Sequence, residues 1–140
     1  MPYTILALLR RKPGTTPSHF KTYYETKHIP LLKEIAGPDF PTFHKRYYLP
    51  RTRLSDTTET AGEPDTSNAA FPAPVIAGTA EDFQFDVYAE VIFRDEGHFA
   101  AFRKALGRDA EVLARDEEMF LDRARIQVVR VDEPCVAMGE

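Results

Sequence analysis

The chain has 140 residues, of which 43% are apolar and 29% charged, the composition of one ordinary globular domain. Its net charge of −4, with both signs scattered along the chain, argues against nucleic acid as a partner, because nucleic acid selects a basic stripe. No apolar run approaches the ~20 residues of a membrane span. The single cysteine, Cys135, cannot form an internal disulfide. We expect one cytoplasmic domain over residues 1–140, with no membrane or nucleic-acid partner.

The first 40 residues predict a strand followed by a helix. Residues 3–11 form an apolar run closed by two arginines and a Pro-Gly turn, which favours a strand buried on both faces. Thr16 offers a hydroxyl as N-cap and Pro17 fits the first helical position. Apolar residues then recur every three or four positions. We expect Pro30 to kink or end this helix, and Gly37 to stop whatever continues beyond it.

Residues 43–49 predict a second strand, because polar and apolar side chains alternate along it. One face receives Phe43, Lys45, Tyr47 and Leu49, and the other receives His44, Arg46 and Tyr48.

Residues 51–81 differ from the rest of the chain, since they are rich in Thr, Pro, Ser and acidic residues and show little periodicity. A loop this long is normally functional or disordered. Residues 54–68 look mobile, whereas residues 69–77 are apolar enough to lie against the body or a neighbour. The segment is a surface insertion or a lid over a pocket, and the pattern leaves both open.

The second half of the chain repeats the strand and helix order. Residues 83–93 alternate clearly and predict a strand with one wholly apolar face. Asp95 caps a predicted helix that ends at Gly107. A short helical segment follows over residues 109–114, then a turn that buries Phe120. The inner face of the helix that Asp95 caps carries Phe99, Phe102, Ala105 and Leu106. Residues 126–131 form the last predicted strand.

This order, βαββαβ, predicts an α+β, ferredoxin-like fold with a four-stranded antiparallel sheet. Helices on one face leave the other face needing cover, and we expect a second copy of the chain to supply it. The apolar side of residues 83–93 and the two-sided first strand are the surfaces that call for this homodimer.

Residues 12–32 resemble the opening signature of EthD-domain proteins, in the dimeric α/β-barrel superfamily. The matching residues are Lys12, Gly14, Phe20, Tyr23, Tyr24, His28 and Pro30, and a weaker match covers Asp116, Glu117, Phe120 and Asp122. The resemblance implies a cofactor-free fold with a pocket between sheet and helices. The chain is similar to EthD-like fungal enzymes that tailor aromatic polyketides. Residues 51–81 exceed what a minimal member of that family needs.

His28 is the leading catalytic candidate, because imidazole titrates near neutral pH and the resemblance places it in the motif. The alternative is a histidine that only caps the helix. Tyr24 lies one turn earlier on the same face, and His44 joins them if its strand face is the one under the helices. Asp116 is expected to orient a histidine, act as an acid or base, or sit in a solvated turn. The expected substrate-contacting residues are Tyr23, Tyr47, Tyr88, Phe85, Phe102 and Asp116.

His19 and His98 fall in first turns of predicted helices, so we expect both on the surface. The histidines show no metal-binding spacing, and no nucleotide-binding motif is present. The resemblance implies a lyase or cyclase that uses no metal or cofactor and moves protons on a small aromatic substrate, by decarboxylation, dehydration or cyclisation. The alternatives are a cofactor-free monooxygenase that converts an anthrone-like phenol to a quinone, and a non-catalytic dimer that binds small molecules.

Overall fold

The computed structural model describes residues 1–54 and 65–140. In that part of the chain four antiparallel strands form one sheet in the order β2-β3-β1-β4. This is the ferredoxin-like arrangement, and the predicted fold class is confirmed. The strands are β1 (Tyr3–Leu9), β2 (Phe43–Tyr48), β3 (Val87–Phe93) and β4 (Gln127–Val131).

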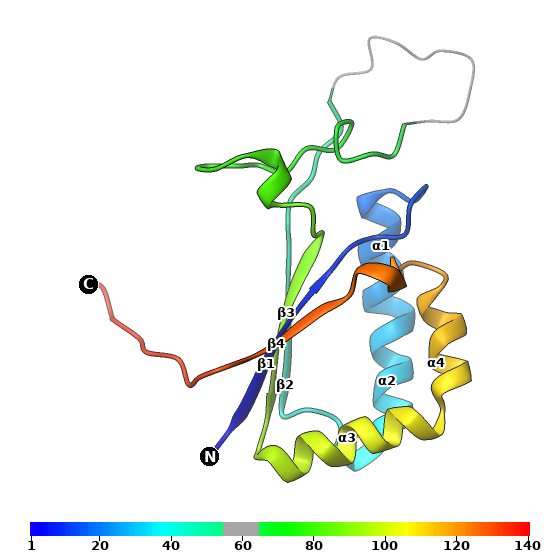
Figure 1. Ribbon diagram of the computed structural model, residues 1–140, viewed down its shortest axis with the longest axis vertical. Helices are drawn as coiled ribbons and strands as arrows, with labels where there is room; N and C mark the ends of the chain where they lie inside the picture. The colour runs from blue at the N-terminus through cyan, green and yellow to red at the C-terminus, as the bar shows by residue number, and fades with distance from the viewer. Residues whose placement is uncertain (55–64) are drawn as a thin grey trace.

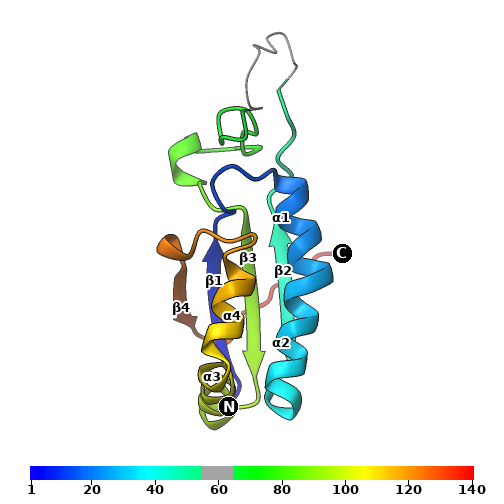
Figure 2. The same cartoon turned by 90° about the vertical axis from the view of Figure 1, so that its right-hand side faces the viewer.

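The helices lie on one side of the sheet, as both views show (Figures 1 and 2). The residues after β4 run out on the opposite side (Figure 1). The α-helices are α1 (Pro17–Tyr23), α2 (Ile29–Ala36), α3 (Glu96–Arg108) and α4 (Ala110–Glu117). The remaining elements are the π-helix η1 (Tyr24–His28) and the 3₁₀ turns η2 (Gly37–Asp39), η3 (Ala80–Asp82) and η4 (Arg123–Arg125).

The first helix begins as predicted, since the Thr16 side chain accepts a hydrogen bond from the His19 backbone and Pro17 takes the first position. Pro30, however, does not break the helical path. The turn before it widens into η1, where the Ile29 amide donates to the Tyr24 carbonyl five residues earlier. A wide turn accommodates a residue that lacks its own N–H. The path then continues as α2 and stops at Gly37, at a φ of 53°.

The core lies between β3 and the helices. Val87, Ala89, Val91 and Phe93 are all buried there, against residues of α1, α2 and α3. This corrects our expectation that the apolar side of β3 needs a second copy as cover, because the helices of the same chain cover it. β1 is likewise not buried on both faces, since Leu6 and Leu8 remain partly exposed.

Three buried charges tie the long segment after β2 to the sheet. Asp86 pairs with the guanidinium groups of Arg11 and Arg51. Arg51 also donates to the backbone carbonyls of Phe71, Phe83 and Phe85. The Arg11 amide donates to the Asp86 side chain at 2.8 Å. β3 begins directly after Asp86, at Val87 and not at Phe83.

Phe71 is 9% exposed, which agrees with the expectation that residues 69–77 lie against the body, although Ile76 in the same stretch is fully exposed. Of the stretch expected to be mobile, residues 55–64 lie outside the described residues.

His98 corrects a second expectation, because it is buried and not on the surface. Its Nδ1 accepts from the Arg94 amide at 3.1 Å, and its Nε2 faces the carbonyls of Asp39 and Phe40, each at 3.1 Å. It therefore ties the start of α3 to η2 and the residue after it. Asp95 caps α3 as predicted, but the helix runs through Gly107 to Arg108.

Candidate functional site

The π turn η1 carries the two leading candidates into the space between helix and sheet. Tyr24 and His28 are 2% and 6% exposed. Their rings meet edge to face, with centroids 5.3 Å apart. Because a π turn adds a residue to the helical repeat and is frequent at functional sites, η1 is the local feature that marks this region.

His28 is held by a carboxylate from the other half of the chain. Its Nδ1 lies 2.7 Å from Oδ2 of Asp116, in the last turn of α4. The other oxygen, Oδ1, accepts from the Tyr23 hydroxyl at 2.8 Å. A carboxylate accepts and does not donate, so Nδ1 of His28 carries the hydrogen. The Nε2 lone pair of neutral His28 is therefore left for other chemistry.

The segment after α4 sets the position of this carboxylate. Its backbone pairs with the end of β1 through Lys12 N to Phe120 O at 2.8 Å and Asp122 N to Arg10 O at 2.9 Å. The Phe120 ring is fully buried, 4.9 Å from the His28 ring and stacked at 5.1 Å on Tyr23. The Phe120 ring thus packs as an apolar group against His28 and Tyr23, the two residues that contact Asp116.

A second polar group faces η1 from β2. Arg46 makes a two-pronged ion pair with Glu25, at 2.5 and 2.9 Å. Glu25 also accepts from the Tyr48 hydroxyl at 2.5 Å. Arg46 Nη1 lies 3.0 Å from Nδ1 of His44. The face of β2 that bears His44 is therefore the helix-covered one, which was the condition for His44 to join His28.

Burial shifts several of these groups in one direction, toward their neutral forms. It raises the pKa of Tyr24 well above its usual value, and it raises that of Tyr23 to about 12 with help from the Asp116 carboxylate. Burial, together with the positive charge of Arg46 and the nearby His28 imidazole, lowers the pKa of His44 to about 4. His44 and the tyrosines are therefore neutral at pH 7.

Two polar atoms on the neighbouring rings of His28 and Tyr24 lack a hydrogen-bond partner among the described residues. No hydrogen bond within residues 1–54 and 65–140 reaches Nε2 of His28 or the hydroxyl of Tyr24. The Tyr24 ring also meets His44 edge to face at 6.3 Å. Of the predicted site residues, the structure brings together His28, Tyr24, His44, Tyr23 and Asp116.

The other predicted substrate contacts lie elsewhere. Tyr47 and Tyr88 stack on each other at 4.7 Å on the sheet face opposite the helices, and Phe85 lies beside Tyr88. Phe102 belongs to the core cluster around Phe93 and Ala36. The structure does not bring these four side chains to His28.

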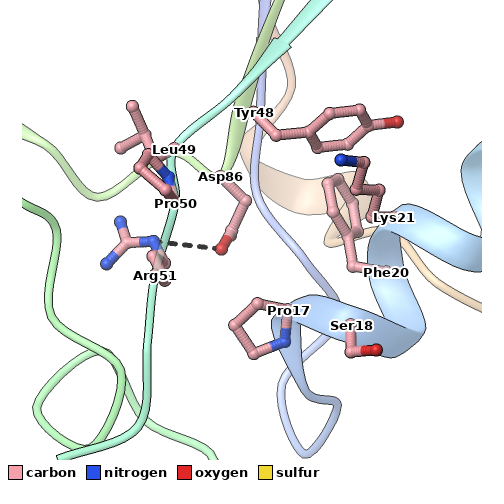
Figure 3. Close-up of a pocket in the computed structure, with 9 residues that line it drawn as sticks. All are labelled: Pro17, Ser18, Phe20, Lys21, Tyr48, Leu49, Pro50, Arg51 and Asp86. Atoms are coloured by element: carbon pink, nitrogen blue, oxygen red, sulfur yellow. Dashed lines mark ion pairs between the residues drawn. The ribbon is translucent and has the colours of Figure 1, made fainter.

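A cavity of about 260 Å³ opens beside this region, at the start of α1 (Figure 3). Its walls are the rings of Phe20 and Tyr48 and the end of β2, with Asp86 and Arg51 at one side. Lys21 lies 5.1 Å from the centre of the Tyr48 ring. Neither histidine lines this cavity. Phe20 and Tyr48 separate it from Tyr24, against which both pack edge to face.

Glu25 is the site residue that the sequence did not reveal. Arg46 and Tyr48 share the His44 face by simple alternation, and Glu25 is the anion that unites them. The available signal was a glutamate next to Tyr24, opposite a strand face that carries an arginine. Within residues 1–54 and 65–140, no cluster of three or more His, Cys, Asp or Glu side chains is placed to hold a metal ion. No helix in the same residues has the length and apolarity to cross a membrane.

Comparison with protein-family models shows the family to which the chain belongs. The EthD domain model matches residues 12–124, which include Tyr23, His28, His44 and Asp116. The chain belongs to the EthD domain family. No curated protein matches the sequence significantly.

Two solved EthD structures share the fold at low sequence identity. An EthD-like protein from Ralstonia eutropha JMP134 is 13% identical, with a TM-score of 0.51 over 91% of this chain and 89% of the other. An ethyl tert-butyl ether D (EthD) family protein from Bacillus halodurans C-125 is 16% identical, with a TM-score of 0.50 over 96% and 100%. A dimeric ferredoxin-like protein of unknown function from Thermobifida fusca YX is 15% identical, with a TM-score of 0.47 over 94% and 90%.

Proposed function

We propose that this EthD protein is a proton-transfer enzyme in which His28 is the general base and acid. The observation that carries the proposal is the 2.7 Å contact between Nδ1 of His28 and Asp116. It fixes the tautomer, orients the ring and leaves Nε2 free, as an acid–base histidine requires. A histidine that only capped the helix would bond to the backbone, whereas His28 makes no side-chain cap at the start of α2 and contacts Asp116.

The substrate class we propose is a small aromatic polyketide, rich in carbonyl and phenol groups. Removing a proton next to a carbonyl creates an enolate, and a neutral hydroxyl such as that of Tyr24 stabilises its oxygen by a hydrogen bond. Decarboxylation, dehydration and cyclisation of such rings all pass through this kind of anion. Tyr24 keeps its proton at neutral pH, as an ordinary tyrosine does, and burial raises its pKa further.

The test is solvent deuterium uptake into the acidic C–H of an anthrone or an aromatic β-ketone, followed by mass spectrometry. His28→Ala should abolish uptake, and Asp116→Asn should reduce it by about 10²-fold or more because the carboxylate no longer fixes the tautomer. His19→Ala is the matched control, since His19 lies in α1 but is exposed. Unchanged uptake in His28→Ala would refute the assignment.

The same reaction vessels separate the alternative chemistries. Release of CO₂ or loss of water identifies a lyase, and oxygen consumption identifies the monooxygenase alternative. A ligand that binds and is recovered unchanged identifies a binding protein, in which His28 has no chemical role.

We also propose that the open sheet face is covered by a second copy of the chain. Apolar side chains gather there on neighbouring strands, and Phe43, Tyr47 and Val129 are between 44% and 54% exposed. One ion pair, Lys45 with Glu90 at 3.7 Å, lies among them. Since a two-fold axis brings the same patch onto itself, such a face suits a homodimer.

A further inference from the structure

Arg46 and Tyr48 of β2, together with Glu25, have no part in the chemistry proposed for His28. Several hydrogen bonds nevertheless hold these three side chains in place. Arg46 uses two nitrogens on Glu25, and its Nη1 also donates to the His44 backbone carbonyl at 2.8 Å. Tyr48 completes the group through Glu25. A bidentate pair of this kind fixes a guanidinium in one plane. The Nη1 atom is thereby pointed at Nδ1 of His44.

This contact decides where the hydrogen of neutral His44 lies. A guanidinium donates hydrogen bonds and accepts none. The 3.0 Å contact therefore requires the lone pair on Nδ1 of His44 and places the hydrogen on Nε2. His44 is thus a hydrogen-bond donor at Nε2, and protonation of Nδ1 would break the contact with Arg46.

His28 has the reverse arrangement. Its Nδ1 donates to Asp116, so in the neutral ring Nε2 carries the lone pair. Both rings meet the ring of Tyr24 edge to face, at 5.3 and 6.3 Å. The site thus has one imidazole that accepts a proton and a second that offers a hydrogen bond, and each is set by a charged partner of its own.

We propose that His44 is a second catalytic residue, a neutral Nε2–H donor to the oxyanion that forms when His28 removes a proton. Arg46 and Glu25 are positioning residues that hold His44 in this tautomer. This inference rests on the proposed function, and it moves the principal oxyanion contact from Tyr24 to His44.

The proton and the electron pair balance in this step. His28 Nε2 takes a proton from a carbon next to a carbonyl, or from a phenol. The electron pair of the broken bond moves onto the carbonyl or phenol oxygen, which becomes an oxyanion. His44 shares its Nε2 hydrogen with that oxygen but keeps it. Protonation of the product at carbon, or of the leaving group, returns the proton from His28.

The tautomer is tested without any substrate, by long-range ¹H–¹⁵N spectra of histidine-labelled protein. His44→Phe assigns the signals. We expect the wild-type His44 to be neutral at pH 7 with the hydrogen on Nε2. Hydrogen on Nδ1 of His44 in the wild type would overturn the proposal.

The positioning role is tested in the same spectra with matched variants. Arg46→Met should raise the pKa of His44 by about one unit or more and release the fixed tautomer. Lys45→Met removes a cation from the same strand but from the opposite sheet face, so it should change neither. The charged and titratable groups that face His44 are Arg46 from β2 and Tyr24, Glu25 and His28 from η1. An Arg46→Met spectrum equal to that of the wild type would refute the positioning role.

The donor role is tested with 4-nitrophenol, whose phenolate absorbs visible light and whose neutral form does not. The wild type should bind it as phenolate, and His44→Phe should weaken that binding about 10- to 100-fold, the loss of one hydrogen bond to a charged oxygen. Nitrobenzene, which has no hydroxyl, should bind both proteins equally. Equal phenolate binding, or none by the wild type, would contradict the donor role.

Deuterium uptake keeps the two proposals apart. Loss of uptake in His28→Ala with full uptake in His44→Phe would refute the donor role and leave the proposed function standing. Full uptake in both variants would refute the proposed function itself.

Discussion

Three histidines of this chain show how the surroundings give one residue type different roles. His28 is paired with a carboxylate, His44 with a guanidinium, and His98 with backbone groups alone. Sequence position indicated the first, because of the motif around it. It did not indicate the third, because the carbonyls of Asp39 and Phe40 that bury His98 come from a segment almost 60 residues away.

At the scale of single residues, replacing Phe120 tests how much its buried ring contributes to the stability of the protein. Phe120→Ala should lower the free energy of unfolding by about 3–5 kcal/mol, because it removes a fully buried ring and leaves a cavity. Urea denaturation measures this. The control Met119→Ala, at an exposed neighbouring position, should change stability by less than about 0.5 kcal/mol. Similar effects for both would show that the ring is not packed as described.

His44 gives the protein a defined dependence of stability on pH. Its folded pKa of about 4 lies below the unfolded value of about 6.5, so the unfolded chain binds the proton first. The contribution is fully present above pH 6.5 and is lost as the pH falls toward 4. Unfolding by urea at a series of pH values measures it.

The His44→Gln variant supplies the control for that titration, since glutamine keeps the polarity but takes no proton in this range. Its stability should fall less steeply between pH 6.5 and 4 than that of the wild type. Parallel curves would mean that His44 titrates normally in the folded protein.

At the scale of elements, local signals predicted where helices begin better than where strands begin. Thr16, Pro17 and Asp95 act on neighbouring residues, and each cap forms as expected. β3 starts directly after Asp86, which is buried between Arg11 and Arg51 from two other parts of the chain. No period within residues 83–93 contains that information.

Two glycines should respond in opposite ways to the same substitution. Gly37 has a φ of 53°, which L side chains rarely adopt, and an added Cβ would touch nothing. Gly37→Ala should therefore cost about 1–3 kcal/mol through backbone strain alone. Gly107 lies within α3 with open space around it, so Gly107→Ala should stabilise by about 0.5–1 kcal/mol. Thermal unfolding of the pair measures both, and a shift of the same sign in each would contradict the geometry.

For the whole molecule, the order of elements was sufficient to predict the ferredoxin-like sheet, because strand and helix periods are local properties. The face on which each side chain lies was less accessible. The sequence put Tyr47 and Tyr88 among the substrate contacts, whereas the register of β2 and β3 stacks them on the open face. Glu25 escaped notice, because its partners Arg46 and Tyr48 come from a strand some twenty residues later.

The open face yields the prediction at this scale. Tyr47→Lys and Val129→Lys each place a charge on the proposed contact between two copies, so both should shift the protein from dimer to monomer in analytical ultracentrifugation. Ile76→Lys is the control, since Ile76 is fully exposed outside the sheet. A wild type that sediments as a monomer, or variants that stay dimeric, would reject the sheet-to-sheet dimer.

The π turn at Tyr24–His28 also has a meaning for comparing relatives. A π turn contains one residue more than the α-helical turn that it replaces. A relative with an unbroken α-helix here would align with this chain only across a one-residue gap between Tyr24 and His28. At 13–16% identity, an ungapped alignment would pair His28 with the residue next to the relative's histidine. A histidine that both chains share would then look like a substitution.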